Sequence, residues 1–363
     1  MKKSGKKFYC FQKFCVSLHA ETKKTTKLYE STICTRIACM SDYVARIYTR
    51  ADSLPEGLQT DNFFHSPEFF VLCKETPRQK PYLVTAETGD GRVVGQMLAV
   101  VRYRSSWLPP FLYRHCRVLG EGVYAEDVSR QELFGLMLRA LTGRLGRWVL
   151  YTEFSDLSAK MAGYREFREC GFFPVRWMSI HNSLHSRTPE ERISERMQRR
   201  ISLAYERGIV TDEVRSDDDF LAFSRLLRRH NWTKPKRYIP ADEFFRGLHG
   251  EHGRLFLTRY RDRVVGCSAV VYSHNQAYLW YAAYRRKTFA WLRPDVLTIW
   301  HAIKSSYERG CEHIFFMDVG LPFQKNTFRD FILRFGGKPT STYRWFRCSV
   351  GWINRVFSWF YRD

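Results

Sequence analysis

The residues best suited to chemistry lie in the last third of this chain. Asp318 stands near the end of an apolar run, residues 313–319, that predicts a buried strand, where a carboxylate is costly unless it is paired or used. Tyr281 and Tyr284 end an earlier apolar run, and their phenol groups could donate hydrogen bonds to an oxyanion. These residues could transfer an activated acyl group to an amine, with Asp318 as the base or orienting group. The alternatives are an ion pair or helix cap that joins Asp318 to Arg329, and tyrosines that only pack in the core.

Motifs for covalent or metal-dependent catalysis are missing from the sequence. It contains no Gly-x-Ser-x-Gly, no Walker loop and no His-Glu-x-x-His motif. No two of the ten cysteines form a Cys-x-x-Cys pair, and His249 and His252 have no further ligands at metal-binding spacing. Direct transfer to an amine needs none of these groups, because it depends on positioning, a base and oxyanion donors. We therefore expect an enzyme that uses neither a metal nor a covalent intermediate.

Basic residues predict an anionic partner. The 363 residues include 59 Lys and Arg against 37 Asp and Glu, which gives a formal net charge of +22 and a pI near 9.7. Such a surface favours nucleic acid, a nucleotide-linked or phosphorylated substrate, or an anionic membrane, although arginines on solvated helix faces are the simpler interpretation. Arginine is concentrated between residues 192 and 207, and a basic loop follows at 234–237. The candidate substrate-binding residues are Arg199, Arg200, Lys236 and Arg237 from these segments, together with Glu153.

The order of predicted elements explains how such residues could be brought together. Residues 255–337 are predicted to form three meandering strands, a helix at 295–309, a buried strand and a helix that ends before Gly336. Residues 82–180 are predicted to form the same series. The motif Arg-Val-Val-Gly at 92–95 recurs at 263–266, and Arg-Glu-Phe at 165–167 is matched by Arg-Asp-Phe at 329–331. Their shared order and nearly constant spacing indicate a duplicated domain.

The remaining segments are interpreted as connectors and termini. Residues 1–40 are expected to be a disordered or non-native extension, because their signal-like start is broken by Gln12 and Lys13. A capping box at Thr188 predicts a helix over residues 190–207. The predicted organisation is the extension at 1–40, an N-terminal domain at 41–187, a helical basic connector at 188–250, a C-terminal domain at 251–347 and an aromatic and basic terminal helix at 348–363.

The aromatic C-terminal helix has two interpretations. Trp352, Val356, Phe357 and Phe360 can share one helical face, as in a helix that lies in a membrane interface. The interpretation we favour is a terminal helix that closes the gap between the domains, because the segment is short and has few basic residues.

The chain resembles the GNAT superfamily, and more closely the FemAB/FemX-type proteins with two GNAT-like domains in tandem. The resemblance implies an α/β protein with two tandem GNAT-like (acyl-CoA N-acyltransferase-like) domains, each a mixed central sheet flanked by helices. It also implies transfer of an acetyl, other acyl or aminoacyl group from acyl-CoA or aminoacyl-tRNA to an amino group, with cell-wall precursors among the acceptors. The segments that carry the resemblance are residues 151–154, 170–172, 197–200 through Gly208, 280–281, 316–320 and 328–337.

Two departures from the family pattern concern the donor. Fem-type aminoacyltransferases carry a Lys where this chain has Ile332, so that Arg329 or Lys325 would have to replace its phosphate contact. The pyrophosphate loop of acetyl-CoA users is absent before the helix at 295, yet residues 117–122 match that pattern in the first copy. Backbone N–H groups before a helix would suit a pyrophosphate. The candidate cofactor-binding residues are Arg329, Lys325, Arg117, Gly120 and Gly122.

We therefore expect a monomeric N-acyltransferase that moves an acyl group, foremost acetyl, from acetyl-CoA or another acyl-CoA to a small or envelope-precursor amine. One alternative is a Fem-type aminoacyltransferase that uses aminoacyl-tRNA in peptidoglycan bridge formation, with tRNA as a partner. Another is a non-catalytic module that binds an anionic envelope precursor. Scattered cysteines and the lack of an apolar run of about 20 residues predict a cytoplasmic protein, with peripheral contact to the inner membrane face through the C-terminal helix.

Overall fold

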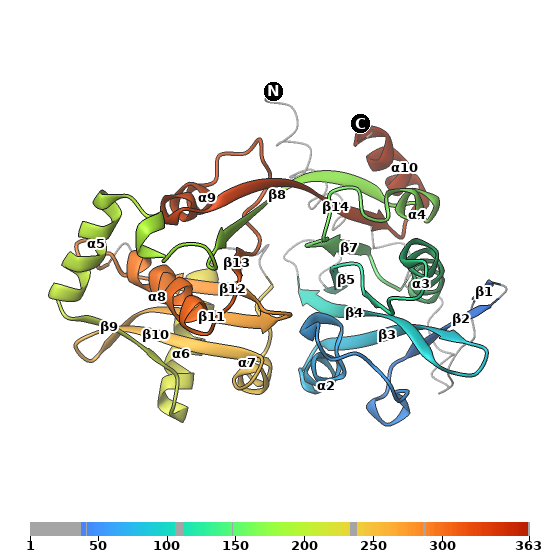
Figure 1. Ribbon diagram of the computed structural model, residues 1–363, viewed down its shortest axis with the longest axis horizontal. Coiled ribbons are helices and arrows are strands. Elements are labelled where there is room, and N and C mark those ends of the chain that lie inside the picture. Colours follow the sequence, from blue (N-terminus) through green and yellow to red (C-terminus); the bar gives the residue numbers. More distant parts are fainter. Residues whose placement is uncertain are drawn as a thin grey trace. The chain divides into compact units, whose positions relative to one another are not determined.

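The computed structural model describes residues 38–40, 42–105, 112–146, 148–232, 238–285 and 288–361, so most of the predicted extension at 1–40 lies outside the described residues (Figure 1). The chain forms two compact units, which are described separately. The predicted connector, 188–250, lies within unit 2, and the C-terminal helix lies within unit 1. Unit 1 comprises Met1–Trp177, Leu321–Gln324 and Ser341–Asp363, and unit 2 comprises Met178–Gly320 and Lys325–Thr340.

One series of elements occurs twice, which confirms the order predicted from the sequence. It consists of three antiparallel strands, a crossover helix, a strand parallel to the third one, a short helix and a long final strand. The first series is β3 (Gln79–Thr88), β4 (Val93–Ser105), β5 (Leu112–Leu119), α3 (Arg130–Leu145), β7 (Tyr151–Ser155), α4 (Tyr164–Glu169) and β8 (Phe173–Ser183). The second is β10 (Gly253–Tyr260), β11 (Arg263–Ser273), β12 (Gln276–Tyr284), α8 (Pro294–Glu308), β13 (His313–Phe316), α9 (Thr327–Ile332) with the turn η5 (Leu333–Phe335), and β14 (Lys338–Cys348).

The C-terminal half of the final strand of each series pairs with a strand of the other series. In unit 1, β7 pairs with β5 in parallel and with the C-terminal half of β14 in antiparallel orientation. In unit 2, β13 pairs with β12 in parallel and with the C-terminal half of β8 in antiparallel orientation. The short strands β1 (Ala38–Met40), β2 (Tyr43–Tyr48) and β6 (Val123–Tyr124) complete the sheet of unit 1, and β9 (Ile209–Glu213) completes that of unit 2.

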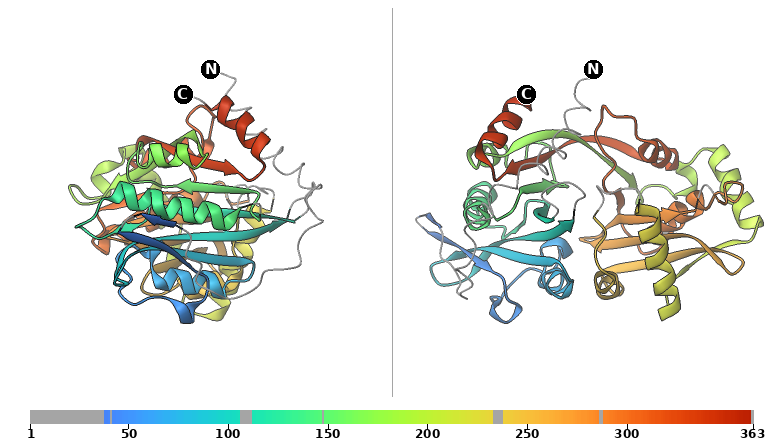
Figure 2. Two further views of the ribbon diagram at one scale, coloured as in Figure 1. Left: turned by 90° about the vertical axis from the view of Figure 1, so that its right-hand side faces the viewer. Right: turned by 180° about the vertical axis from the view of Figure 1, so that it is seen from behind.

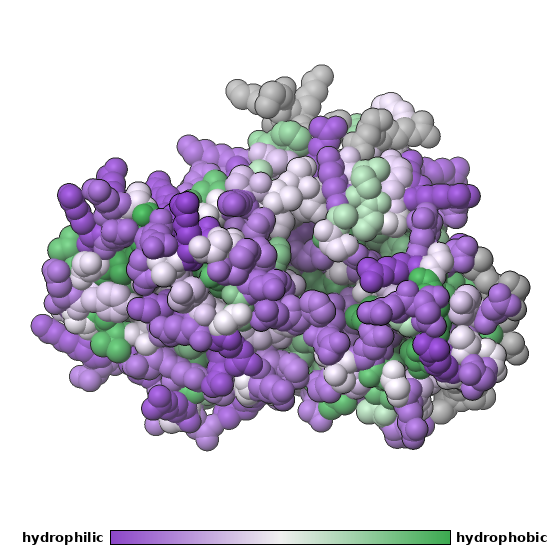
Figure 3. All heavy atoms as spheres, viewed as in Figure 1, coloured by the Kyte–Doolittle hydropathy of each residue, from purple (hydrophilic) through white to green (hydrophobic). Residues whose placement is uncertain are grey.

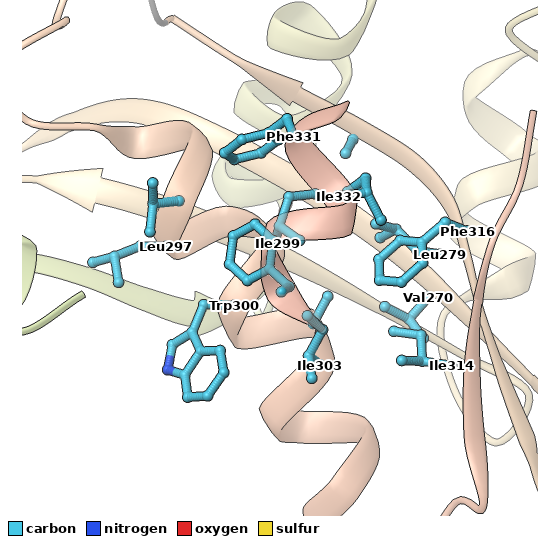
Figure 4. Packing of buried hydrophobic residues seen from close by; sticks show 14 of the residues in the cluster. Val270, Leu279, Leu297, Ile299, Trp300, Ile303, Ile314, Phe316, Phe331 and Ile332 are labelled. Carbon is cyan, nitrogen blue, oxygen red and sulfur yellow. The ribbon is translucent and has the colours of Figure 1, made fainter. Parts of the chain in front are cut away.

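The sheet of unit 2 is covered on both faces. Helix α8 packs its apolar side on β11 and β12 and meets Phe331 and Ile332 of α9, as Figure 4 shows. Helices α6 (Asp217–Asn231) and α7 (Asp242–Leu248) cover the other face, which is seen from behind in Figure 2. Phe244 and Phe245 of α7 pack against Trp280 and Tyr281 on that face. In unit 1, α3 and α2 (Pro67–Glu75) both pack on β3.

The repeated Arg-Val-Val-Gly motif has a packing reason. Gly95 and Gly266 occupy the same place in the two series, early in the second strand of the meander, on the face that the crossover helix covers. A Cβ atom at Gly266 would collide with Oγ1 of Thr298 on α8, and one at Gly95 would lie 3.5 Å from Cδ1 of Leu133 on α3. A residue without a side chain therefore suits both helix–strand contacts.

The predicted helix at 190–207 is wrong at its start. The capping box exists, because the Thr188 N–H donates to the Glu191 carboxylate at 3.1 Å and the Glu191 N–H donates to Thr188 Oγ1 at 3.4 Å. It opens only one 3₁₀ turn, Glu190–Arg192, after which the buried Ile193 is extended. Ser194 then caps a new helix, α5 (Glu195–Glu206), so two caps rather than one position this basic segment.

Candidate functional site

The parallel strand pair of unit 2 ends early. Residues 276–279 of β12 pair with β13, and the last bond runs from the Met317 N–H to the Leu279 carbonyl at 3.4 Å. Strand β12 continues for five residues beyond Leu279, and a bulge at Trp280 bends it. The Arg285 N–H donates to Val265 on β11, and because N–H directions alternate along a strand, the Ala282 N–H points to the opposite edge. This edge of β12 is the candidate site.

Asp318 lies on the turn that follows β13. The strand ends at Phe316, so the prediction that Asp318 ends a strand is wrong by two residues. Its φ of 60° is left-handed, a conformation that Asp tolerates better than most residues with a side chain. Asn326 holds the turn, because its Nδ2 donates to the Val319 carbonyl at 2.8 Å while its Oδ1 accepts the Phe328 and Arg329 N–H groups and caps α9. The half-buried Asp318 carboxylate is therefore carried on a well-defined turn.

The two candidate tyrosines have different surroundings. The Tyr281 ring is buried against Phe245, and its hydroxyl group donates to the Tyr238 carbonyl at 3.3 Å. The half-buried Tyr284 ring lies 6.5 Å from the Phe331 ring of α9, between centroids. Tyr284 thus lies where the end of β12 approaches α9, whereas Tyr281 supports the helix-covered face of the sheet.

Basic side chains surround the start of α8. Burial lowers the pKa of Arg200 on α5, and the neighbouring positive charges of three further arginines lower it further. Together these side chains form what we call the arginine cluster: Arg196, Arg200, Arg293 and Arg334. Arg293 occupies the N-cap position of α8, whose N-terminal N–H groups carry partial positive charge. The cluster therefore combines side-chain and backbone charge that would attract a phosphate.

A carboxylate lies within this basic environment. Asp295, in the first turn of α8, is 1% exposed, and its Oδ1 lies 4.0 Å from Nε of Arg293. A negative charge next to a helix N-terminus is stabilised by the helix dipole, but it also opposes a second anion at the same N–H groups. The anion site would therefore lie on the arginine side chains rather than on the helix backbone.

The other basic candidates of unit 2 lie apart from the cluster or at its edge. Arg199 is 80% exposed and faces Glu195 at 3.7 Å, one turn away on α5. Lys325 is exposed on the loop before α9, whereas Arg329 is 11% exposed and lies 3.9 Å from the Asp330 carboxylate. Lys236 and Arg237 lie outside the described residues. Of the paired candidates Arg199 and Arg200, only Arg200 joins the arginine cluster.

In unit 1, a buried ion network lies on the strand that corresponds to β13, three residues before Asp156, which matches Asp318 in the strand pairing and shares its φ of 60°. Glu153 on β7 contacts Nη1 of Arg344 at 2.9 Å, Nε2 of His115 at 3.2 Å and Nε of Arg117 at 3.8 Å. Burial alone would raise the pKa of Glu153, but these partners, led by Arg117, hold it well below its usual range. Burial lowers the pKa of His115 to about 4, against the opposing effect of Glu153. Glu153 and Arg117 are thus part of the interior of unit 1.

The segment of unit 1 that matches the pyrophosphate loop, residues 117–122, packs and bonds within the sheet. The Gly120 N–H donates to the Ser155 carbonyl at 2.7 Å and extends the β5–β7 pairing. Gly122, with a φ of 111°, lies against β4, where a Cβ atom would be 2.7 Å from the Gln96 carbonyl. Strand β6 and a further turn separate this loop from α3, which begins at Arg130. Gly120 and Gly122 therefore do not directly precede a helix N-terminus.

Sequence reasoning missed Arg293 and Arg334 as site residues. Arg293 precedes the Pro that starts α8, a signal for a helix N-terminus, but nothing in the spacing of Arg334 links it to α5. Ile332, which stands where the family carries Lys, is fully buried in the core of unit 2.

Within the described part of the chain, no three His, Cys, Asp or Glu side chains are placed to hold a metal ion. No helix there has both the length and the apolar character needed to cross a bilayer.

Comparisons with known proteins define the fold. A family model described as an acetyltransferase (GNAT) domain matches residues 192–325. No curated protein matches the chain in sequence. The structure of FemX is similar with 11% identity and a TM-score of 0.55, over 79% of this chain and 97% of that one. The structure of L-PGS from Bacillus licheniformis is similar with 11% identity and a TM-score of 0.53, over 82% of this chain and 92% of that one. This chain therefore has a GNAT-superfamily fold of the FemAB/FemX-like type, with two GNAT-like domains in tandem.

Proposed function

We propose that this protein is an N-acyltransferase that uses unit 2 to transfer an acyl group from an activated donor to an amino group. The observation that carries the proposal is the early end of the β12–β13 ladder. It leaves the edge of β12 beyond Leu279, including the Ala282 N–H, without β13 alongside, while Asp318 follows on the turn after β13. A positioned N–H donor and a carboxylate are the groups that direct transfer to an amine requires.

The reaction forms a C–N bond and breaks the C–S or C–O bond of the donor. The lone pair of the amine attacks the carbonyl carbon, and the carbonyl oxygen takes up negative charge that the Ala282 N–H would stabilise. Asp318 takes the proton from the nitrogen, and the Tyr284 hydroxyl group gives a proton to the leaving thiolate or alkoxide. Exchange with water restores both groups. Tyr281 is left out of this scheme because its hydroxyl group already donates to Tyr238.

The arginine cluster is the proposed site for the phosphates of the donor. Four guanidinium groups near the start of α8 would bind a pyrophosphate or an RNA backbone through charge-assisted hydrogen bonds. The net charge of +22 supports an anionic donor, and the surface seen in Figure 3 is predominantly hydrophilic. Acetyl-CoA or another acyl-CoA is the first candidate.

Asp295 favours a second candidate, aminoacyl-tRNA. Its carboxylate lies in the first turn of α8 and would repel a pyrophosphate that approached the N–H groups there. An RNA backbone could contact the arginine side chains without approaching the helix terminus so closely. The similarity in fold to FemX agrees with this candidate, in which the acyl group would be an amino acid.

Calorimetric titration with acetyl-CoA, and separately with an amide-linked aminoacyl-tRNA analogue, tests the donor site. Arg200→Met should weaken binding of the true donor about tenfold. Arg199→Met, the matched control one residue away on the same helix, should change it less than twofold because Arg199 is exposed. Equal effects of the two substitutions, or binding of neither donor by the unaltered protein, would exclude this site.

Turnover tests the chemistry separately. With the donor that binds, Asp318→Asn should lower kcat about 100-fold while donor affinity stays within twofold. If the protein bound the donor but transferred its acyl group to none of a panel of amines, the proposed enzyme would be rejected. The protein would then be a non-catalytic module that binds an anionic precursor.

A further inference from the structure

Helix α10 (Gly351–Phe360) exposes a row of large apolar side chains on unit 1. Trp359 is 65% exposed, Trp352 49%, Val356 43% and Phe360 43%. Their spacing of four, three and one residues places them on one face of a helix. Soluble domains rarely expose several large aromatic side chains together unless the surface binds something. Figures 1 and 2 show α10 next to the C-terminus, at the edge of unit 1.

The opposite face of α10 fixes the helix on unit 1. Ile353 and Phe357 are buried, and the Phe357 ring lies 6.0 Å from the Phe173 ring on β8. Asn354 accepts the Cys348 N–H at 2.8 Å and donates to the Gly171 carbonyl at 2.8 Å. These contacts set the rotation of the helix about its axis. The exposed face is therefore a consequence of how α10 is anchored, and turning it inward would break both hydrogen bonds.

Charge around α10 is positive. The helix contains Arg355, which is exposed, and no Asp or Glu. Glu169, near the contact with Gly171, is paired with Arg165 at 2.8 Å. The Ser349 N–H, just before α10, donates to the Leu150 carbonyl. Trp148, two residues before Leu150, is half exposed. The Arg114 guanidinium lies 5.3 Å from the centre of the Trp148 ring. A second aromatic and basic pair thus lies next to the entry of α10.

We propose that the outer face of α10 docks on the surface of an anionic lipid bilayer. Tryptophan and phenylalanine with neighbouring arginine are the residues that interfacial helices use, since the rings enter the headgroup region while the cations meet lipid phosphates. Ten residues of helix span about 15 Å, so α10 would lie in the interface and not cross it. The net charge of +22 and the lack of acidic residues on α10 favour an anionic surface, and the exposed tryptophans favour a lipid one. This inference concerns unit 1 and does not depend on the proposed reaction.

Flotation of the full chain with vesicles tests the proposal. The protein should float with vesicles of phosphatidylglycerol and phosphatidylcholine and bind pure phosphatidylcholine at least tenfold more weakly. The double variant Trp352→Ser, Trp359→Ser should bind the anionic vesicles at least tenfold more weakly, and Arg355→Ala about fivefold more weakly. Because these side chains are exposed, circular dichroism should be unchanged.

The matched control is Met161→Ser, which removes a 58% exposed apolar side chain from unit 1 outside α10. It should bind the anionic vesicles like the unaltered protein. Failure of the unaltered protein to float, or equal flotation of the double variant, would overturn the proposal. So would a dimer in sedimentation velocity that the double variant alone dissociates, because the face would then bind a second copy of the chain.

Discussion

The two parallel strand pairs of this protein are built from the same series of elements but end differently. In unit 1, β5 and β7 pair over five residues to the ends of both strands, and the Gly120 N–H extends the ladder. In unit 2, β12 and β13 pair over four residues, after which β12 runs on for five more. One fold can therefore provide a closed edge or an open one, depending on how far the ladder runs. Only an open edge offers backbone donors to a ligand.

Carboxylates of the two units differ in their surroundings, although Asp156, and not Glu153, is the counterpart of Asp318 in the strand pairing. Glu153 lies inside the closed ladder, is 7% exposed and contacts Arg344, Arg117 and His115. Asp318 lies two residues past the end of the open ladder and is half-buried on a turn. A buried and paired carboxylate serves stability, whereas a partly accessible one can exchange protons with a substrate. The counterpart Asp156 lies 3.5 Å from Nη2 of the buried Arg117, so we infer that the copies have diverged into a structural and a reactive member.

The largest effect should come from neutralising the carboxylate of the closed edge. Glu153→Gln leaves the Arg117 and Arg344 guanidinium groups buried without their shared negative charge. Removing one partner of a buried ion network costs about 3–5 kcal/mol, so urea denaturation should show a loss of that size.

A surface substitution provides the control. Glu169→Gln removes an exposed partner of Arg165 and should change the unfolding free energy by less than about 0.5 kcal/mol. If Glu153→Gln instead left stability unchanged and raised the KM of an acceptor, Glu153 would bind substrate and the comparison between the units would fail.

The next largest effect should come from the glycine shared by the two series. Gly266→Ala would place a Cβ atom against the buried Thr298, whose hydroxyl group bonds Thr258 at 2.8 Å, and should cost about 1–3 kcal/mol in urea denaturation. Gly95→Ala meets the ring of Tyr124 at 3.2 Å and the flexible end of Met137 at 3.5 Å, and should cost about 1 kcal/mol or less. Equal losses would mean that the two crossover helices pack equally closely.

The series of elements could be predicted from the sequence because its signals are local. Alternating apolar runs, the turn at Asp90 and glycines after helices mark each element, and the repeated motifs support one another. The end of the β12–β13 ladder could not be predicted in this way, because residues 313–319 form one apolar run although the strand stops at Phe316. The turn that follows is held by Asn326, whose Nδ2 donates to the Val319 carbonyl, and no pattern within the apolar run marks this contact.

The candidate site was predicted less completely than the fold. Arg199 and Arg200 are alike in sequence, and only the rotation of α5 on unit 2 separates an exposed side chain from a member of the arginine cluster. The exchange of β8 and β14 between the series also has no local signal, because a final strand can pair with either copy of its neighbour. Both features depend on contacts between residues far apart in the chain.

Acid should also weaken the closed edge of unit 1. His65 is fully buried, its Nδ1 accepts the Leu98 N–H at 3.1 Å, and a Cβ atom at Gly120 would lie 3.1 Å from its Nε2. Burial lowers the pKa of His65 to about 4. Below pH 6.5 the unfolded chain takes up a proton that the folded one does not, so stability falls as the pH drops toward 4. Between pH 7 and pH 5 this histidine should account for a loss of about 2 kcal/mol.

Comparison of variants isolates this contribution from that of the carboxylates. His65→Asn keeps an acceptor for the Leu98 N–H but cannot gain a proton, so its unfolding free energy should fall by about 2 kcal/mol less than that of the unaltered protein between pH 7 and pH 5. His274→Asn, in an exposed turn of unit 2 whose φ of 48° suits Asn, should retain the original pH dependence. A pH dependence that His65→Asn left unaltered would mean that the loop at Gly120 admits water to the imidazole ring. The edge of unit 1 would then be open in solution, and the ladder of β5 and β7 would no longer distinguish the two copies.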